Sequence, residues 1–244
     1  MSDSPRARRA REAAATSQSG PGRRALPPLY LISDAARIGE DAFLERFGEA
    51  VRGGLSMVLL REPAWGPESI SRLAGRVQAR LRESSNISVR VLLSRRAELA
   101  AELALDGVHL AGGDPSAVSS ARRRLGATRT IGYSAHSIEE ACKAAAEGAD
   151  YVSYSPVFGS ISKGRHPLPA VGLEGVAEAS RVVAVPVYAL GGILPEHAGA
   201  LRKRGAAGAA MIGGILDAAD PAAAVRAFLS SWDAAAPEQE AAAP

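Results

Sequence analysis

Eight short apolar runs, each followed by a helical pattern, constrain the fold of this chain more than any other feature. Each run has four or five residues and is apolar almost throughout, as expected for parallel strands that are covered on both faces. The runs are Leu29–Ser33, Ser56–Leu60, Val89–Leu93, Gly107–Leu110, Thr130–Tyr133, Tyr151–Tyr154, Val185–Ala189 and Ala209–Ile212. Strands that alternate with helices indicate βαβ units in a parallel sheet.

The helical segments between the runs have their own boundary signals. Ser137 and Glu140 match a capping box, and Gly148 and Gly205 stand where helices stop. The predicted helices are Asp41–Arg52, Pro67–Arg82, Ala97–Leu105, Pro115–Leu125, Ile138–Glu147, Leu173–Arg181, Pro195–Arg204 and Pro221–Trp232. Eight such units with short connections predict a closed (β/α)8 TIM barrel, and an open doubly wound sheet of similar periodicity is the alternative.

The composition predicts one folded domain between two tails. The chain has 244 residues, and barrels of this type take about 250. We expect the barrel over residues 27–233, with a disordered Arg-rich tail at 1–26 and another at 234–244. The first tail has six arginines, two acids and no aromatic residue, which argues for a solvated extension and against nucleic-acid binding. With no long apolar stretch and no secretory signal, we expect a cytoplasmic protein without membrane contact.

Two glycine pairs point to a phosphorylated ligand. In a barrel of this type the active site lies on the loops that follow the strands, and the last two loops commonly bind phosphate. Gly191-Gly192 follows the seventh run and Gly213-Gly214 the eighth, with a short helix expected at Ile215–Ala218. Glycine lets backbone N–H groups approach an anion closely. We therefore predict phosphate binding at these four glycines.

A long loop follows the sixth run. Ser155–Gly172 is too long for a plain connection, and long loops at this end of a barrel commonly carry function. It contains hydroxyl and cationic side chains that suit an anionic ligand, namely Ser160, Ser162, Lys163 and Arg165. His109 lies within the fourth run, and we expect it to pack inside the barrel.

The phrases "LYLISD", "GYSAHS", "GADYV", "PVF" and "VPVYALGGI" occur here in the order in which they occur in a known family. In these motifs the chain resembles the thiamine phosphate synthase and thiazole tautomerase family, from about Leu29 to Trp232. The resemblance implies a TIM barrel that acts on a small-molecule thiazole phosphate. It is also compatible with a homodimer.

The synthase branch of this family joins a pyrimidine pyrophosphate to a thiazole phosphate with magnesium. The resemblance to this branch gives Asp114 a metal-binding role and assigns substrate-binding roles to Arg61, Ser134, Ser160, Ser162 and Lys163. Two motifs differ. The family's Gln-x-Arg-x-Lys reads Leu59-Leu60-Arg61-Glu62-Pro63 here, and its Asn-Asp reads Ser94-Arg95.

The tautomerase branch of the family also lacks these two synthase motifs, so the chain resembles this branch as well. Its catalytic histidine falls on His136, beside the predicted helix start, where the helix dipole favours the neutral imidazole that a base needs. One imidazole can remove a proton and return it to another carbon. Our main expectation is therefore cofactor-free tautomerisation of a thiazole carboxylate phosphate, with His136 as the acid and base and with Arg61 holding the carboxylate or orienting the ring.

Two alternatives stay open. One is a magnesium-dependent synthase with altered pyrophosphate contacts, in which Asp114 would hold the metal. The other is a catalytically inactive protein that binds a thiamine precursor, suggested by Ser94-Arg95-Arg96 and the basic tail.

Overall fold

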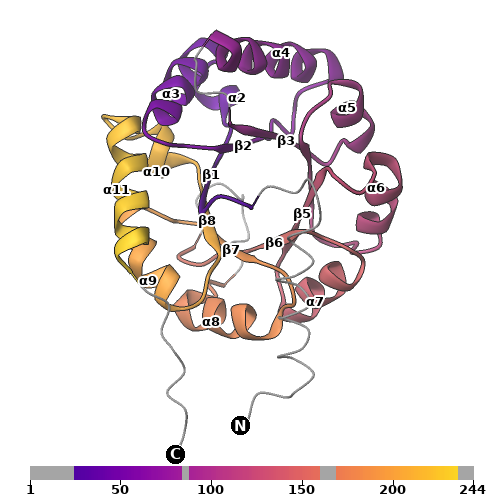
Figure 1. Ribbon diagram of the computed structural model, residues 1–244, viewed down its shortest axis with the longest axis vertical. Helices are drawn as coiled ribbons and strands as arrows, with labels where there is room; N and C mark the ends of the chain where they lie inside the picture. The colour runs from indigo at the N-terminus through magenta and orange to yellow at the C-terminus, as the bar shows by residue number, and fades with distance from the viewer. Residues whose placement is uncertain (1–24, 84–87, 160–168, 236–244) are drawn as a thin grey trace, which may run out of the picture.

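The computed structural model describes residues 25–83, 88–159 and 169–235. Its eight strands form one closed, wholly parallel barrel in chain order, and helices surround the barrel (Figure 1). The first strand pairs with the last, for example Leu29 with Ala209. This pairing confirms the TIM barrel and excludes the open sheet. The two predicted tails lie almost wholly outside the described residues and stay predictions.

Each predicted run contains or overlaps a strand. The strands are β1 Leu29–Ile32, β2 Met57–Leu60, β3 Arg90–Ser94, β4 Gly107–Leu110, β5 Thr130–Ala135, β6 Tyr151–Tyr154, β7 Val187–Leu190 and β8 Gly208–Met211. The ends differ by up to two residues. At β7 the reason is local, because Pro186 has no N–H to donate to a ladder and the strand begins after it.

The helices follow the predicted order, with differences at their ends. They are α3 Glu40–Arg52, α4 Pro67–Glu83, α5 Ala97–Glu102, α6 Ala117–Leu125, α7 Ile138–Ala146, α8 Gly172–Val182, η1 Pro195–His197, α9 Ala198–Lys203, α10 Gly213–Leu216 and α11 Pro221–Ala234. The predicted helix Pro195–Arg204 is divided, because its first turn is a 3₁₀ helix. The short helix expected at Ile215–Ala218 begins two residues earlier.

The helix α2, which spans Ala35–Ile38, was not predicted from the sequence. A single turn is too short to show helical periodicity. Its start is held from outside by the carboxylate of Glu62, which accepts hydrogen bonds from the amides of Ala35 at 2.7 Å and Ala36 at 2.9 Å. A tertiary contact therefore satisfies the amide donors that a helix start leaves open.

The interior of the barrel is filled by alternate residues of the strands. Tyr30, Tyr151 and Tyr188 are fully buried there, and the rings of Tyr151 and Tyr188 pack edge to face with centroids 5.2 Å apart. The Tyr188 hydroxyl donates a hydrogen bond to the carbonyl of Pro27 at 2.6 Å. The segment before β1 is thus fastened to the interior of the barrel.

Glycines make room for these rings. A Cβ at Gly132 would lie 2.3 Å from Tyr151 and 2.4 Å from the ring of His109, and one at Gly208 would lie 2.4 Å from Tyr188. Large side chains on some strands therefore require glycine on their neighbours, because a close-packed interior has no spare volume.

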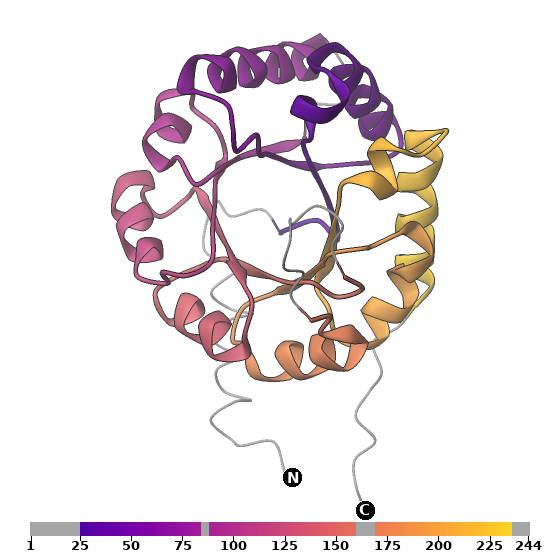
Figure 2. The same cartoon turned by 180° about the vertical axis from the view of Figure 1, so that it is seen from behind.

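The space between the barrel and the helices holds the larger apolar core, which includes Phe43, Phe47 and Phe228. The last helix, α11, packs against α3 and α9 and closes the helical ring, as both views show (Figures 1 and 2). Within the described ranges, no helix is long and apolar enough to span a membrane.

We expect Gly132→Ala to destabilise the protein by about 1–3 kcal/mol, because the added methyl group overpacks the barrel interior. Gly75 on α4 is the matched control, since it is exposed and nothing lies within 4 Å of a Cβ built there. Gly75→Ala should raise stability by roughly 0.5–1 kcal/mol through helix propensity. Urea unfolding of both variants tests this, and an unchanged midpoint for Gly132→Ala would contradict it.

Candidate functional site

Arg61 lies at the mouth of the barrel. Met57 and Leu59 of β2 belong to the interior cluster, and alternation along the strand directs Arg61, the next residue of that series, toward the same axis. Its amide is held by the Ser33 hydroxyl at 2.8 Å, and its side chain is exposed. Burial, and then the charge of Arg61, lower the pKa of His109 to about 3. The positive charge of the Arg61 guanidinium therefore disfavours protonation of a histidine inside the barrel.

His109 is buried and neutral, as its expected interior position requires. Its Nδ1 is 2.8 Å from the Tyr151 hydroxyl. Its Nε2 is 2.9 Å from the hydroxyl of Ser134 and 3.2 Å from that of Ser153. His109 does more than pack, because it orients Ser134, a predicted substrate-binding hydroxyl that is half-buried near the mouth.

His136 follows β5, and its ring is fixed by Ser155. Nδ1 lies 3.1 Å from the Ser155 carbonyl oxygen and 3.3 Å from its hydroxyl. A carbonyl can only accept, so Nδ1 carries the proton and Nε2 has the lone pair in the neutral ring. Ser155 was not predicted as a site residue from the sequence. Its only signal was its position directly after the sixth run.

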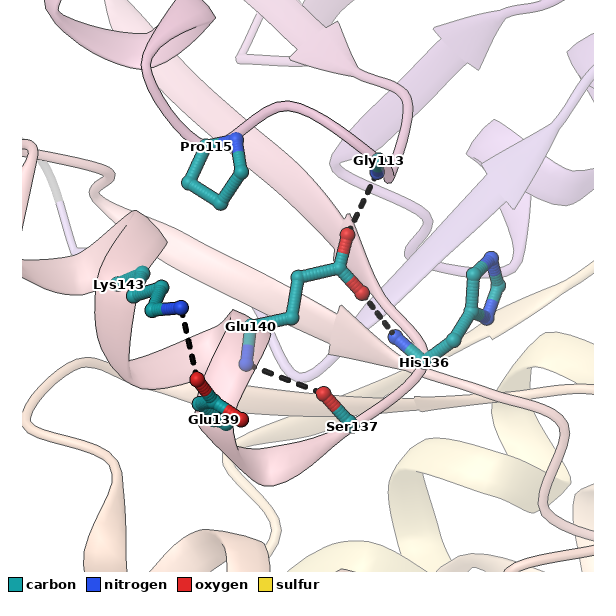
Figure 3. Close-up of a pocket in the computed structure, with 7 residues that line it drawn as sticks. All are labelled: Gly113, Pro115, His136, Ser137, Glu139, Glu140 and Lys143. Atoms are coloured by element: carbon teal, nitrogen blue, oxygen red, sulfur yellow. Dashed lines mark hydrogen bonds and ion pairs between the residues drawn. The ribbon is translucent and has the colours of Figure 1, made fainter.

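Glu140 ties the loops after β4 and β5 together (Figure 3). Its carboxylate accepts from the amides of Gly113 at 2.6 Å and His136 at 2.8 Å, and from the Tyr133 hydroxyl at 2.8 Å. Burial opposes its ionisation, but these bonds outweigh burial and hold the pKa of Glu140 below its ordinary value. The predicted capping box is half right. Ser137 caps the amide of Glu140, whereas the Glu140 side chain reaches His136.

An open polar pocket of about 390 Å³ lies beside these loops. In Figure 3 the ring of His136 points away from Glu139 and Lys143, which line this pocket. The pocket therefore belongs to the outer rim, while the His136 ring turns toward the loop after β6. The lining residues are Gly113, Pro115, His136, Ser137, Glu139, Glu140 and Lys143.

The two glycine pairs lie at the ends of the adjacent strands β7 and β8. Gly191 and Gly192 both have positive φ, and a Cβ on either would come within about 3 Å of the loop after β6. Close packing against the loop after β6 thus explains why both positions require glycine, and the sequence did not reveal this reason. Gly213 and Gly214 begin α10, and no acceptor within residues 25–83, 88–159 and 169–235 pairs with their amides. Phosphate binding at these glycines stays a prediction.

Three other predicted substrate-binding residues, Ser160, Ser162 and Lys163, lie outside the described residues. Their assignment to the site also stays a prediction.

The side chains at the mouth do not fit a magnesium site. Asp114 Oδ1 accepts from the amide of Ser116 at 3.0 Å and from its hydroxyl at 2.6 Å, which is the geometry of a turn. Arg95 stands where the family has an acidic residue, and a guanidinium cannot ligate a cation. In the described part of the chain, no three His, Cys, Asp or Glu side chains gather as metal ligands.

The closed barrel, with polar side chains and glycine pairs on the loops after its strands, defines the class of (β/α)8 enzymes that act on small molecules. The sequence profile described as "Thiamine monophosphate synthase" matches residues 29–215. The chain belongs to this family. It is 37% identical over 205 residues to a thiamine-phosphate synthase of Syntrophomonas wolfei, covering 84% of this chain and 96% of the relative.

Two further similarities agree. A thiamine-phosphate synthase of Roseiflexus sp. is 35% identical over 200 residues, covering 82% of this chain and 83% of the relative. A solved thiamine phosphate pyrophosphorylase of Pyrococcus furiosus superposes with a TM-score of 0.72 at 27% identity, covering 84% of this chain and 95% of that one. The names of these relatives favour the synthase alternative over the tautomerisation that we expected first.

We expect Glu140→Gln to reduce stability at neutral pH by roughly 1–2 kcal/mol, because charge-assisted bonds to the two loops are weakened. Since the pKa of Glu140 is lowered by folding, its contribution is complete above the ordinary carboxyl value of about 4.3 and is lost as the pH falls through the folded-state pKa. Urea unfolding at pH 7 and in acid measures the difference from wild type, which should shrink in acid. Glu139→Gln is the control, because that carboxylate is exposed and forms a surface ion pair with Lys143. An equal effect of both variants would contradict the assignment.

Proposed function

We propose that the protein joins a pyrimidine pyrophosphate to a thiazole phosphate, forming thiamine phosphate and releasing pyrophosphate. One observation carries the proposal. Arg61 and Arg95 follow the neighbouring strands β2 and β3, and both are exposed. Two cations that form no ion pair with residues 25–83, 88–159 or 169–235 match a pyrophosphate, whereas the carboxylate of the tautomerase substrate would need only one. The whole-length similarity to proteins named thiamine-phosphate synthase supports the same reaction.

The roles of the chain's own residues follow from this reaction. A thiazole nitrogen forms a bond to the pyrimidine's methylene carbon while the carbon–oxygen bond to pyrophosphate breaks, and the bonding electrons leave with pyrophosphate. Arg61 would stabilise that developing charge. The amides of Gly213 and Gly214, with Gly191 and Gly192 beside them, would bind the thiazole phosphate. The attacking nitrogen uses its own lone pair, so the step needs no protein base.

A second candidate function rests on His136. Its Nδ1 faces the Ser155 carbonyl. In that tautomer of the neutral ring Nε2 has the lone pair that a base would use to remove a proton from a thiazole carboxylate phosphate and return it to another carbon. Both reactions would take place at the mouth of the barrel, and both substrates carry the thiazole phosphate group. Under either one the ligands are small molecules. The cytoplasmic location and the homodimer stay predictions.

We expect wild-type protein to form thiamine phosphate, and Arg61→Ala to lower kcat/KM for the pyrimidine pyrophosphate by about 100-fold, because a preorganised charge at the leaving group is lost. Arg61→Lys should recover part of the loss, since it restores the charge without the planar fork. Chromatographic detection of product measures both variants, with Arg82→Ala as the exposed control from the end of α4. Absence of product from wild type, with and without added magnesium, would contradict the proposal.

His136→Ala separates the two reactions. We expect coupling to persist within about tenfold of wild type, because no general base is needed, whereas loss of a general base costs a tautomerase about 10²–10⁴-fold. The measurement is conversion of each substrate set by wild type and variant. Aromatisation of the thiazole carboxylate phosphate by wild type, lost in His136→Ala, would establish the second candidate instead.

A further inference from the structure

The loops after β2 and β3 hold positive charge that no acidic residue neutralises. The side chains of Arg61 and Arg95 take part in no ion pair within the described part of the chain. The ladder between β2 and β3, with Leu60 opposite Leu93, brings the two loops side by side. Arg96 from the second loop also donates to the carbonyl of Trp65 in the first. The two free guanidinium groups therefore belong to one part of the rim.

Two carboxylates on these and the adjacent loops, Glu62 and Asp114, have other partners. Glu62 is buried and accepts hydrogen bonds from the Ser33 hydroxyl and from the amides at the start of α2. Asp114 is engaged by Ser116. These bonds keep both acids away from the arginines. The uncompensated positive charge of the rim therefore attracts anions from solution.

Arg95 stands in a backbone conformation that does not favour it. Its φ is 67°, in the left-handed region where Asn and Asp are several-fold enriched over other non-glycine residues. The turn is fixed by bonds from the Arg95 amide to the His109 carbonyl at 2.9 Å and from the Arg96 amide to the Ser94 carbonyl at 2.9 Å. An aspartate, the residue that the family has here, would fit this backbone better. Conformational strain of this kind is concentrated at functional sites.

From these observations we infer that Arg95, together with Arg61, takes the place of a divalent cation, so that this site binds and releases pyrophosphate without magnesium. The inference rests on the proposed function. A planar guanidinium forms paired hydrogen bonds to phosphate oxygens and carries the charge that a bound metal would supply. It also repels a divalent cation from the same position. The pyrophosphate needs positive charge beside it. Either Arg95 or a bound metal ion can supply that charge, but the two cannot occupy the same position.

The test is calorimetric titration of the full chain with inorganic pyrophosphate, first in EDTA and then with excess magnesium. We expect wild type to bind in EDTA, with a Kd within about threefold of that in magnesium, which is a small difference in free energy. Arg95→Ala should weaken binding about tenfold or more in EDTA, as expected for loss of hydrogen bonds to a charged group. Binding of thiazole phosphate should not change.

Arg95→Asp gives the sharpest comparison. The substitution restores the family's acidic residue on a backbone that suits it, and we expect pyrophosphate binding by this variant to require magnesium. Arg82→Asp, which makes the same charge change at the end of α4, is the control and should behave as wild type. Circular dichroism spectra and melting curves of both variants verify that they are folded.

The outcomes are distinguishable. If wild type binds pyrophosphate only with magnesium and forms thiamine phosphate under the same condition, the inference is wrong and the proposed function stands. If wild type binds no pyrophosphate in either condition, both are wrong. The inference also fails if Arg95→Ala binds as tightly as wild type in EDTA, or if magnesium does not improve binding by Arg95→Asp.

Discussion

Pairing of β1 with β8 is the constraint on which the rest of the structure depends. Once the sheet is closed, alternate residues of each strand must either fill the barrel or pack under the helices, and all eight following loops meet at one mouth. Filling a narrow barrel with Tyr30, Tyr151 and Tyr188 then requires glycine at positions 132 and 208. Closure also directs Arg61 toward the axis and sets His136 beside Ser155.

Two acidic residues near the mouth hold loops in place. Glu62 joins the loop after β2 to the start of α2, and Glu140 joins the loops after β4 and β5. Both carboxylates use their oxygens on backbone amides, which gives rigid support at little cost in side-chain entropy. This end of the barrel therefore keeps its shape through a buried acid, Glu62, and a half-buried one, Glu140, while Arg61 and Arg95 stay exposed there.

This division of charge bears on the chemistry. The chain shares its fold with the family but has Arg95 where the synthase branch has an acidic residue. Under the proposed function, the charge on the loops after β2 and β3 would meet the pyrophosphate. An anionic leaving group needs positive charge where its electrons arrive. Under the proposed function the neighbouring arginines would supply it, and under the second candidate Nε2 of His136, whose Nδ1 faces the Ser155 carbonyl, would supply a lone pair. The barrel positions both without commitment to either reaction.

The sequence by itself determined the barrel, the order of its elements and the family. The reason is that local patterns of a few residues indicate which strands are buried, where helices begin and end, and which motifs the loops contain. It also located Arg61, His136 and the glycine pairs at the ends of strands. The sequence did not reveal α2, because Glu62 caps that turn from 27 residues away. Nor did it reveal that Glu140 reaches His136, that Ser155 fixes the imidazole, or that Gly191 and Gly192 are required by the loop after β6. These contacts join residues from different loops, and only closure of the sheet brings such loops together.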